Sequence, residues 1–223
     1  MKNPWQQMPL AVYEAHMGFD GIEQLQALNR IMKSQWTAYA GAVSAAVLGV
    51  ASGNGLEYCG HNLEIIYGID VNAEYLQECG RRFFPSLGSR LQLIEADIGK
   101  LGTRLPEVDL LIADLVIEYM GTEIFCAKAA ESLAKYISCV IQAVAKNDFV
   151  SESPYQSEFE EIGLFHHDIN EITLTANFQN YGYQQVVREV IDLPNGKQFV
   201  RLDYCWSKGE TMSETIIQNE YFV

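Results

Sequence analysis

The sequence predicts an α/β fold built on a mostly parallel sheet, with helices on both faces and an antiparallel hairpin towards the C-terminal end. The first observation is a short apolar run at residues 47–50 that passes directly into a loop of small residues and glycines. The second is a series of further apolar runs that alternate with helical patterns, as in successive βαβ units. The third is a pair of β-rich runs, 184–193 and 198–206, joined by a Pro-Asn-Gly-Lys turn that is typical of hairpins.

Composition favours a globular chain and excludes several kinds of partner. The 223 residues are 48% hydrophobic and 20% charged, which is ordinary for a chain with one core. The net charge is −14 and no basic cluster exceeds Arg81-Arg82, whereas a protein that follows a phosphate backbone needs a positive stripe. No apolar run approaches the roughly 20 residues that span a membrane. We therefore expect no nucleic-acid partner and no membrane partner.

The N-terminus and the cysteines indicate a compartment. The first residues lack an apolar signal region. The five cysteines are scattered and contain no Cys-x-x-Cys pair, which argues against disulfides and zinc. We expect a cytoplasmic protein.

Residues 1–45 are expected to be helical and to precede the sheet. Between residues 21 and 33, apolar residues recur every three or four positions, so one face of this helix is buried. Upstream, Tyr13, Glu14 and His16 place an aromatic ring, an acid and an imidazole within one turn. This upstream segment is either an ordinary capped helix with a surface histidine or part of a functional site.

The stretch 47–58 is the centre of the pattern. Its apolar start predicts a buried strand, and Gly53 and Gly55 permit a tight turn and the close approach of a ligand. The residues after Gly55 predict a helix whose N-terminus would face that ligand. Strand, glycine loop and helix form the first half of a nucleotide-binding βαβ unit.

Carboxylates follow the next two strands. The apolar run 63–70 ends in Asp70, and an acid at the end of the second strand of such a unit hydrogen-bonds the ribose hydroxyls of the nucleotide. A strand at 91–96 is followed by Asp97, which can also act as the N-cap of a short helix.

The remaining elements continue the alternation. A helix at 73–83 begins after Asn72, a good N-cap, and Pro85 lies just beyond its end. The later elements are a strand at 108–115, a helix at 122–135, a strand at 137–144 and a helix at about 169–181.

The glycine loop distinguishes between nucleotide ligands. A dinucleotide loop has a small residue where Tyr58 stands, and a Walker loop needs Gly-Lys-Ser/Thr, which is absent. The stretch instead resembles motif I of the class I S-adenosylmethionine-dependent methyltransferases, which runs apolar-acid-apolar-Gly-x-Gly-x-Gly. Gly53 and Gly55 keep two of the glycines, Ala51 takes the place of the first, and Gly49 stands where the acid usually lies.

The resemblance covers about residues 45–206. It implies a Rossmann-like class I methyltransferase fold: a mostly parallel seven-stranded sheet, a C-terminal antiparallel hairpin, helices on both faces and an N-terminal helical lid. It implies S-adenosyl-L-methionine as cofactor, with Asp70 at the ribose and Asp97 at the adenine amino group. The cofactor-binding residues carried over from the family are Gly49, Ala51, Ser52, Gly53, Asn54, Gly55, Asp70, Val71, Asp97, Ile98, Asp114 and Leu115.

N-terminal helices often cover the cofactor cleft in this family. The resemblance therefore implies that Tyr13, Glu14 and His16 are lid residues with a catalytic role. A methyl group on a sulfonium is already activated, so positioning supplies much of the acceleration. A general base is needed only where the acceptor must lose a proton, and neutral histidine suits that task.

Two other constellations are weaker candidates for a site. His166 and His167 fit a polar loop beside a helix cap better than a catalytic base. Asp114 with Asn147 and Asp148 resembles a magnesium site only loosely, because the order and the offsets differ. We expect no metal site.

The sequence thus predicts a methyltransferase that acts on an O or N atom of a small-molecule acceptor, as a monomer or homodimer. We expect one domain, 1–223, with a cap at 1–45, a cofactor-binding half at 46–150 and a substrate-side half with the hairpin at 151–223. One alternative is a non-catalytic regulatory protein that binds the same cofactor, because Gly49 replaces the acid. Another is a nicotinamide-dependent oxidoreductase, which Tyr58 and the hairpin disfavour.

Overall fold

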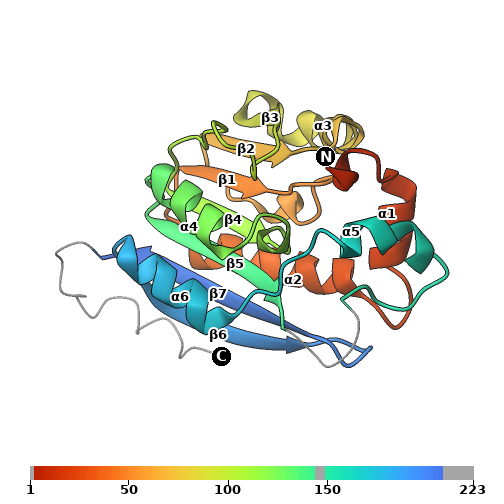
Figure 1. The fold of residues 1–223 in the computed structure, drawn as a ribbon. Helices are drawn as coiled ribbons and strands as arrows, with labels where there is room; N and C mark the ends of the chain where they lie inside the picture. The colour runs from red at the N-terminus through yellow and green to blue at the C-terminus, as the bar shows by residue number, and fades with distance from the viewer. Residues whose placement is uncertain (1–2, 144–148, 208–223) are drawn as a thin grey trace, which may run out of the picture.

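The computed structural model describes residues 3–143 and 149–207 (Figure 1). At its centre lies a seven-stranded sheet with the strand order β3-β2-β1-β4-β5-β7-β6. β1 to β5 run parallel, and β7 lies antiparallel between β5 and β6. The predicted fold class and its terminal hairpin are confirmed. The strands are β1 (Ser44–Leu48), β2 (Ile65–Asp70), β3 (Leu91–Glu95), β4 (Leu110–Asp114), β5 (Tyr136–Gln142), β6 (Tyr183–Asp192) and β7 (Gln198–Trp206).

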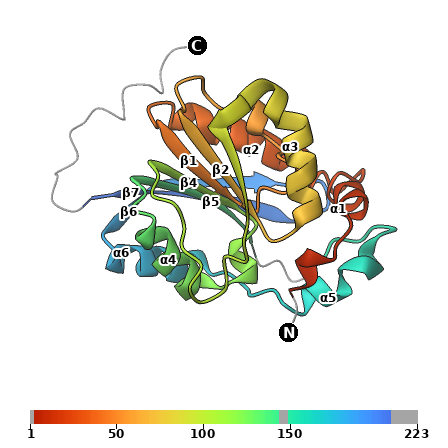
Figure 2. The same ribbon diagram turned by 90° about the horizontal axis from the view of Figure 1, so that it is seen from above.

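Helices cover both faces of the sheet (Figure 2). One face carries α2 (Gln24–Ala38) and α3 (Ala73–Leu87), and the other carries α4 (Thr122–Glu131) and α6 (Glu171–Asn180). At the carboxyl ends of the parallel strands lie α1 (Leu10–Met17) and the short α5 (Glu160–Gly163). Within the described residues, no helix combines the length and the apolar character that crossing a membrane requires.

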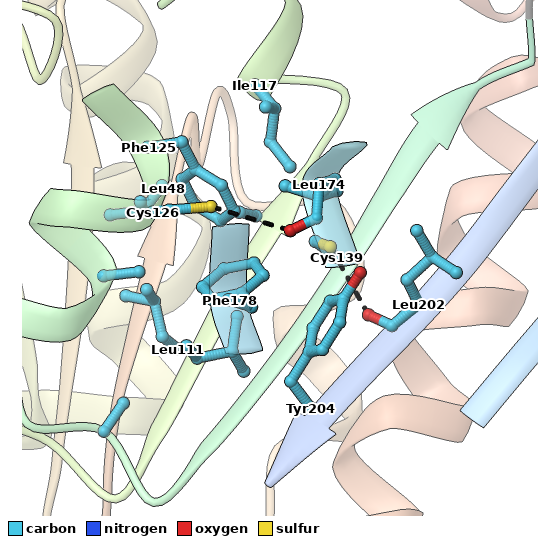
Figure 3. Packing of buried hydrophobic residues seen from close by; sticks show 14 of the residues in the cluster. Leu48, Leu111, Ile117, Phe125, Cys126, Cys139, Leu174, Phe178, Leu202 and Tyr204 are labelled. Carbon is cyan, nitrogen blue, oxygen red and sulfur yellow. Dashed lines mark hydrogen bonds between the residues drawn. The ribbon is translucent and has the colours of Figure 1, made fainter. Parts of the chain in front are cut away.

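The larger part of the core lies between the sheet and helices α4 and α6 (Figure 3). The ring of Phe178 in α6 meets that of Phe125 in α4 edge-on, with centroids 5.6 Å apart. It also lies 4.4 Å from the ring of Tyr204 in β7. All three side chains are completely buried. Full burial of a phenylalanine contributes roughly 2–3 kcal/mol, so these rings hold the helix layer on the sheet.

On the opposite face, α2 packs against β1 and against the glycine loop that follows it. Met32 and Trp36 belong to the same buried cluster as Val47 and Leu56. The indole Nε1 of Trp36 donates a hydrogen bond of 3.1 Å to the carbonyl oxygen of Gly55. The loop is therefore fastened to a helix that precedes it in the sequence.

The prediction of a helix after Gly55 is wrong. Only a 3-10 turn, η2 (Leu56–Tyr58), follows the loop, and Cys59 already has extended backbone. The apolar residue that suggested a helical face, Leu56, is completely buried in the cluster that α2 forms with β1. Because α2 already covers this part of the sheet, the connection to β2 needs no crossover helix.

Helix α3 is longer than predicted. The side chain of Asn72 caps its start as expected, accepting from two backbone N–H groups of the first turn. Pro85, however, lies inside the helix rather than beyond its end. A proline in the last turn removes only one hydrogen bond, and Leu87 stays buried beyond it. The helix ends at Gly88, whose φ is +57°. Val144, predicted as the last residue of the fifth strand, lies outside the described residues.

A buried polar network joins α2 to the sheet beneath it. Asp203 in β7 accepts hydrogen bonds from Tyr39 and Ser138 and a two-pronged ion pair from Arg201. Arg201 in turn donates to the hydroxyl of Ser34 in α2, at 2.8 Å. Each partner offsets the desolvation of the carboxylate, so the network holds α2 at one register on the sheet.

The glycine at the α2 contact can be tested directly. Gly55 has φ +90°, and a Cβ there would lie 2.7 Å from Met32. Gly102 has nearly the same φ, +88°, and a Cβ there would meet nothing within 4 Å. We expect Gly55→Ala to lower the free energy of unfolding in urea by about 2 kcal/mol more than Gly102→Ala, since only the first adds a clash to the backbone strain. Equal losses would show that the loop does not depend on close packing against α2.

Candidate functional site

A cavity of about 1120 Å³, its opening included, lies at the carboxyl ends of the parallel strands. The chain adds β2 and β3 on one side of β1 and then crosses over to add β4 and β5 on the other side, and ligands of open α/β sheets bind at the point where the strand order reverses in this way. The floor of the cavity comes from the loops that follow four strands. Its residues are Gly49 and Ala51 after β1, Asp70 and Val71 at the end of β2, Asp97, Ile98 and Gly99 after β3, and Asp114, Leu115 and Val116 at the end of β4.

Two segments that are distant in sequence cover the cavity. One is the N-terminal segment, residues 3–17, and the other is the roof segment, residues 149–163. They meet at His16, whose Nδ1 lies 2.7 Å from Ser153 Oγ and whose ring lies 4.2 Å from that of Phe159. Trp5 also contacts Phe159, with ring centroids 6.3 Å apart.

The β6–β7 hairpin holds the start of the roof segment. Lys197 Nζ donates to the carbonyl oxygen of Phe149 at 2.6 Å, and Asn195 donates to Ser151 Oγ at 3.0 Å. Because Phe149 and Ser151 line the cavity, the hairpin tip contributes to the position of its wall.

Asp70 is the most constrained acid of the site. Its Oδ2 accepts from the backbone N–H of Ala51, and its Oδ1 accepts from that of Asn72, each at 2.9 Å. Burial raises the pKa of Asp70, and these backbone donors oppose the rise. The carboxylate is thus fixed in orientation at the cavity wall, with lone pairs left over for a ligand.

Asp97 lies on the same wall, one strand further out. Its Oδ1 accepts from the backbone N–H of Gly99 at 3.1 Å, which closes a turn of the Asx type. Asn3 and Lys100 approach its other oxygen at 3.4 and 3.8 Å. The alternative that Asp97 caps a helix is wrong, because turns and irregular backbone follow it up to β4.

Only the first part of the glycine loop lines the cavity. Gly49 and Ala51 do so, with φ angles of +65° and +47°. Leu115, on the opposite side, has φ +55°. Left-handed backbone at a non-glycine residue costs free energy and is concentrated at functional sites. The conformations of Ala51 and Leu115 therefore indicate that this wall is part of a functional site.

The second part of the loop faces helices instead. A Cβ on Gly53 would lie 2.5 Å from the ring of Phe83, and Asn54 exchanges hydrogen bonds with Leu25 and Asn29 of α2. Ser52 donates to Glu14. These contacts join the loop to α1, α2 and α3. The residues that make them do not line the cavity: Ser52, Gly53, Asn54 and Gly55.

The three residues expected on the lid have different positions. Tyr13 and His16 line the cavity, and His16 is only 3% exposed, so it is not a surface histidine. Burial, and secondly the charge of Lys197, lower the pKa of His16 to about 4, which leaves the ring uncharged at neutral pH. Glu14 does not line the cavity. It pairs with Arg82 of α3 at 2.7 Å and accepts from Ser52, which ties α1 to the loop.

Two buried carboxyl groups follow β4. Burial raises the pKa of Asp114 to about 7, opposed by the hydrogen bond from Gln35 and by Arg201. Burial raises the pKa of Glu118 to about 7 as well. Each group has one oxygen, Oδ2 of Asp114 and Oε2 of Glu118, without a hydrogen-bond partner among the described residues. Asp114 lines the cavity and Glu118 does not.

Neither of the two weaker candidate sites, the His166–His167 pair and the loosely matching magnesium site, is assembled among the described residues. His166 bonds to the carbonyl oxygen of Gly163 and to Asp168, in a loop before the helix cap Asn170. Asn147 and Asp148 lie outside the described residues. In the part of the chain that the structure describes, no three His, Cys, Asp or Glu side chains are grouped as a metal ion would require.

Sequence reasoning missed most of the aromatic wall. Trp5, Tyr75, Tyr119, Phe149 and Phe159 all line the cavity. For Tyr75 a signal existed, because the first turn of a helix that follows a β2 carboxylate must lie near that carboxylate. For the residues of the roof segment there was none, since their sequence has no clear periodicity.

No protein-family model matches the sequence, and no curated protein matches it. Solved structures do match. Magnesium protoporphyrin IX methyltransferase (ChlM) from Synechocystis PCC 6803, with bound SAH, superposes with a TM-score of 0.67 and 13% identity, over 91% of this chain and 96% of that one. The N-methyltransferase NodS from Bradyrhizobium japonicum WM9, in complex with S-adenosyl-L-homocysteine, gives 0.62 and 15%, over 92% and 98%.

The [4+2]-cyclase SpnF also has this architecture, with a TM-score of 0.61 and 12% identity over 82% of each chain. The chain therefore has the fold of the class I methyltransferases, as the resemblance in the glycine loop implied. At these identities the likeness concerns the fold, and SpnF illustrates that proteins named for another reaction share it.

The buried acid outside the cavity gives a test by pH. The folded-state pKa of Glu118 lies above its ordinary value, so the folded protein binds more protons than the unfolded chain between about pH 4.5 and 7. Stability from this group is therefore lost as the pH rises through that window. We expect Glu118→Gln, which keeps an acceptor for the backbone N–H of Gln142, to raise the free energy of unfolding by up to about 3 kcal/mol near pH 8 and by little near pH 5. A gain of equal size at both pH values would show that the charge of Glu118 is not the cause.

Proposed function

We propose that this chain is an S-adenosyl-L-methionine-dependent methyltransferase that acts on an O or N atom of a small-molecule acceptor. The observation that carries the proposal is the orientation of Asp70. Its carboxylate lies in the wall of a cavity at the switch point of the sheet and is held there by two backbone N–H groups. The fold, shared with structures that contain SAH, supports the same cofactor.

The cavity wall suits this cofactor. Asp70 can accept from ribose hydroxyls, Asp97 from an adenine amino group, and Ile98 can pack against the ring. The hydroxyl of Tyr75 is buried beside them without a partner among the described residues, so a ligand hydroxyl or amine there would satisfy it. Gly49, Ala51, Val71 and Leu115 supply close backbone contact, whereas Ser52, Gly53, Asn54 and Gly55 act indirectly by holding the loop.

The bound cofactor supplies a methyl group already activated on a sulfonium, so the chain has to position the acceptor, exclude water and accept a proton where one leaves. The N-terminal segment and the roof segment cover part of the cavity, which reduces the access of water to it. Its pKa of about 4 keeps His16 uncharged at neutral pH, and when Nδ1 donates to Ser153 Oγ, Nε2 keeps a lone pair that can accept a hydrogen bond from the acceptor. Tyr13 packs beside the acceptor, and Glu14 positions α1 through Ser52 and Arg82.

A regulatory protein that binds the cofactor without turnover is the second candidate. The observation that favours it is Gly49, which leaves the first strand without the carboxylate that motif I usually carries. Both candidates predict cofactor binding, and formation of S-adenosylhomocysteine in the presence of an acceptor separates them.

The cofactor site is tested by calorimetry. We expect S-adenosylhomocysteine to bind, Asp70→Asn to weaken binding by at least about tenfold, and Asp97→Asn to weaken it less, since water can replace a single adenine hydrogen bond. Asp20→Asn, which removes an exposed carboxylate elsewhere, should leave the affinity unchanged.

Melting temperatures of all three variants show whether lost binding reflects lost folding, because Asp70 also accepts two backbone bonds. Unchanged affinity in folded Asp70→Asn would remove this residue from the site. Binding of NAD(H) in place of S-adenosylhomocysteine would overturn the proposed function.

A further inference from the structure

Residues 3–8, the part of the N-terminal segment that precedes α1, contact the end of the cavity that β2 and β3 form. We call these residues the strap; it lies at the red end of the chain, beside the carboxyl end of β2 (Figure 1). The proposed function assigns the adenosine of the cofactor to this end, with the adenine amino group on Asp97 and the ribose on Asp70. The strap and the cofactor would therefore meet the same two carboxylates.

The first contact of the strap is with Asp97, whose two oxygens both accept hydrogen bonds from this chain. Oδ1 accepts from the backbone N–H of Gly99, and Oδ2 accepts from Nδ2 of Asn3 at 3.4 Å. The amide of Asn3 is, like the amino group of adenine, a planar nitrogen that carries two N–H donors. Asn3 lines the cavity, and with it in place the Asp97 side chain is only 16% exposed. An adenine amino group would therefore compete with Asn3 for Oδ2.

Lys100 approaches the same oxygen of Asp97, at 3.8 Å, but it is a weaker competitor. Its side chain is largely exposed and does not line the cavity. An exposed ion pair of this kind contributes little free energy, so Lys100 can give way to a ligand at small cost.

The second contact of the strap covers Asp70. Nδ2 of Asn72 donates to the carbonyl oxygens of Trp5 and Met8, at 2.8 and 3.0 Å, while the backbone N–H of Asn72 donates to Asp70. Met8 is buried in one cluster with Ala51, whose N–H donates to the other oxygen of Asp70. With the strap in this position Asp70 is only 8% exposed. Ribose hydroxyls therefore gain full access to the carboxylate only when the strap moves.

The strap can be released without the rest of the N-terminal segment, because α1 has contacts of its own. Glu14 pairs with Arg82 of α3 at 2.7 Å and accepts from Ser52. His16 Nδ1 lies 2.7 Å from Ser153 Oγ of the roof segment. None of these contacts involves residues 3–8, so α1 keeps its place when the strap leaves.

Two features make the strap easy to displace. The Asn3–Asp97 distance of 3.4 Å exceeds the usual range of about 2.7–3.2 Å for such a bond, so a well-placed ligand donor binds the carboxylate better. The indole Nε1 of Trp5 is buried without a hydrogen-bond partner among the described residues. A buried donor without an acceptor is destabilising, and release of the strap to water would satisfy it.

We propose that the strap is an autoinhibitory contact, which the cofactor has to displace before it binds. Asn3 takes the place of the adenine amino group on Asp97, and residues 5–8, held by Asn72, cover Asp70. This inference rests on the proposed function, because it takes the ligand to contain adenosine. The affinity for the cofactor is then reduced by the fraction of molecules whose strap is bound, and a substitution that releases the strap strengthens cofactor binding.

Three asparagines that each cap a helical turn provide matched variants. The side chain of Asn3 caps η1 (Pro4–Gln6), that of Asn72 caps α3, and that of Asn170 caps α6. Serine keeps an oxygen for the cap at all three positions. Only Asn3→Ser and Asn72→Ser remove an amide that holds the strap. Asn170→Ser, at an exposed position outside the cavity wall, is the control.

S-adenosylhomocysteine is titrated by calorimetry into the full chain and into each variant, and its association rate is measured by stopped flow. We expect Asn3→Ser and Asn72→Ser to bind it at least about threefold more tightly and to associate faster, and Asn170→Ser to match the unaltered chain. Melting temperatures show whether each variant is folded. If Asn72→Ser does not fold, Asn3→Ser decides alone, because Asn3 belongs to no buried cluster.

The autoinhibitory contact and the proposed function fail differently. Equal affinity in all four proteins, or weaker binding in folded Asn3→Ser, would overturn only the autoinhibitory contact, and the second result would make the strap part of the cofactor site. Binding to the strap variants but not to the unaltered chain supports both proposals. No binding of S-adenosylhomocysteine to any of the four proteins contradicts the proposed function, and the inference that rests on it fails too.

Discussion

The site depends on the carboxylate of Asp70, which accepts the backbone N–H groups of both Ala51 and Asn72. One side chain thereby connects the loop after β1, the end of β2 and the start of α3. The two bonds satisfy buried donors that no helix or strand could satisfy at that point, and they hold Ala51 in its left-handed conformation. The same carboxylate faces the cavity, so the group that stabilises the edge of the sheet is also the group best placed to bind a ligand.

The connection from β1 to β2 is unusual in lacking a crossover helix, and α2 compensates for it. This helix comes from the N-terminal side of β1, contributes Met32 and Trp36 to the cluster over the strand, and fixes Gly55 through a hydrogen bond. In motif I, the glycines allow a ligand to approach closely. In this chain, Gly53 and Gly55 are required for the close approach of α3 and α2. The polar network around Asp203 adds hydrogen bonds to the contact between α2 and the sheet. Because hydrogen bonds are directional, they hold α2 in register, whereas apolar contact alone would not.

The strands were predictable because buried parallel strands are short, continuous apolar runs. The hairpin was predictable because Pro-Asn-Gly between two β-rich runs is typical of a hairpin turn. The acids at the strand ends followed from topology alone. The helix after Gly55 was predicted wrongly because a local apolar pattern cannot reveal that α2 already covers β1. The aromatic wall was largely missed because Phe149 and Phe159 belong to an irregular segment whose place depends on tertiary contacts with His16 and Lys197.

The anchoring of the roof segment by the β6–β7 hairpin bears on the order in which the chain is made. β7 inserts between β5 and β6, and the hairpin tip holds Phe149 and Ser151, which were synthesised earlier. A nascent chain that has emerged only as far as α6 contains the parallel strands, the floor of the cavity and the contacts of His16 with Ser153 and Phe159, but not the two hydrogen bonds from the hairpin tip. The start of the roof segment is therefore fixed in place late in biosynthesis, when the last pair of strands has joined the sheet.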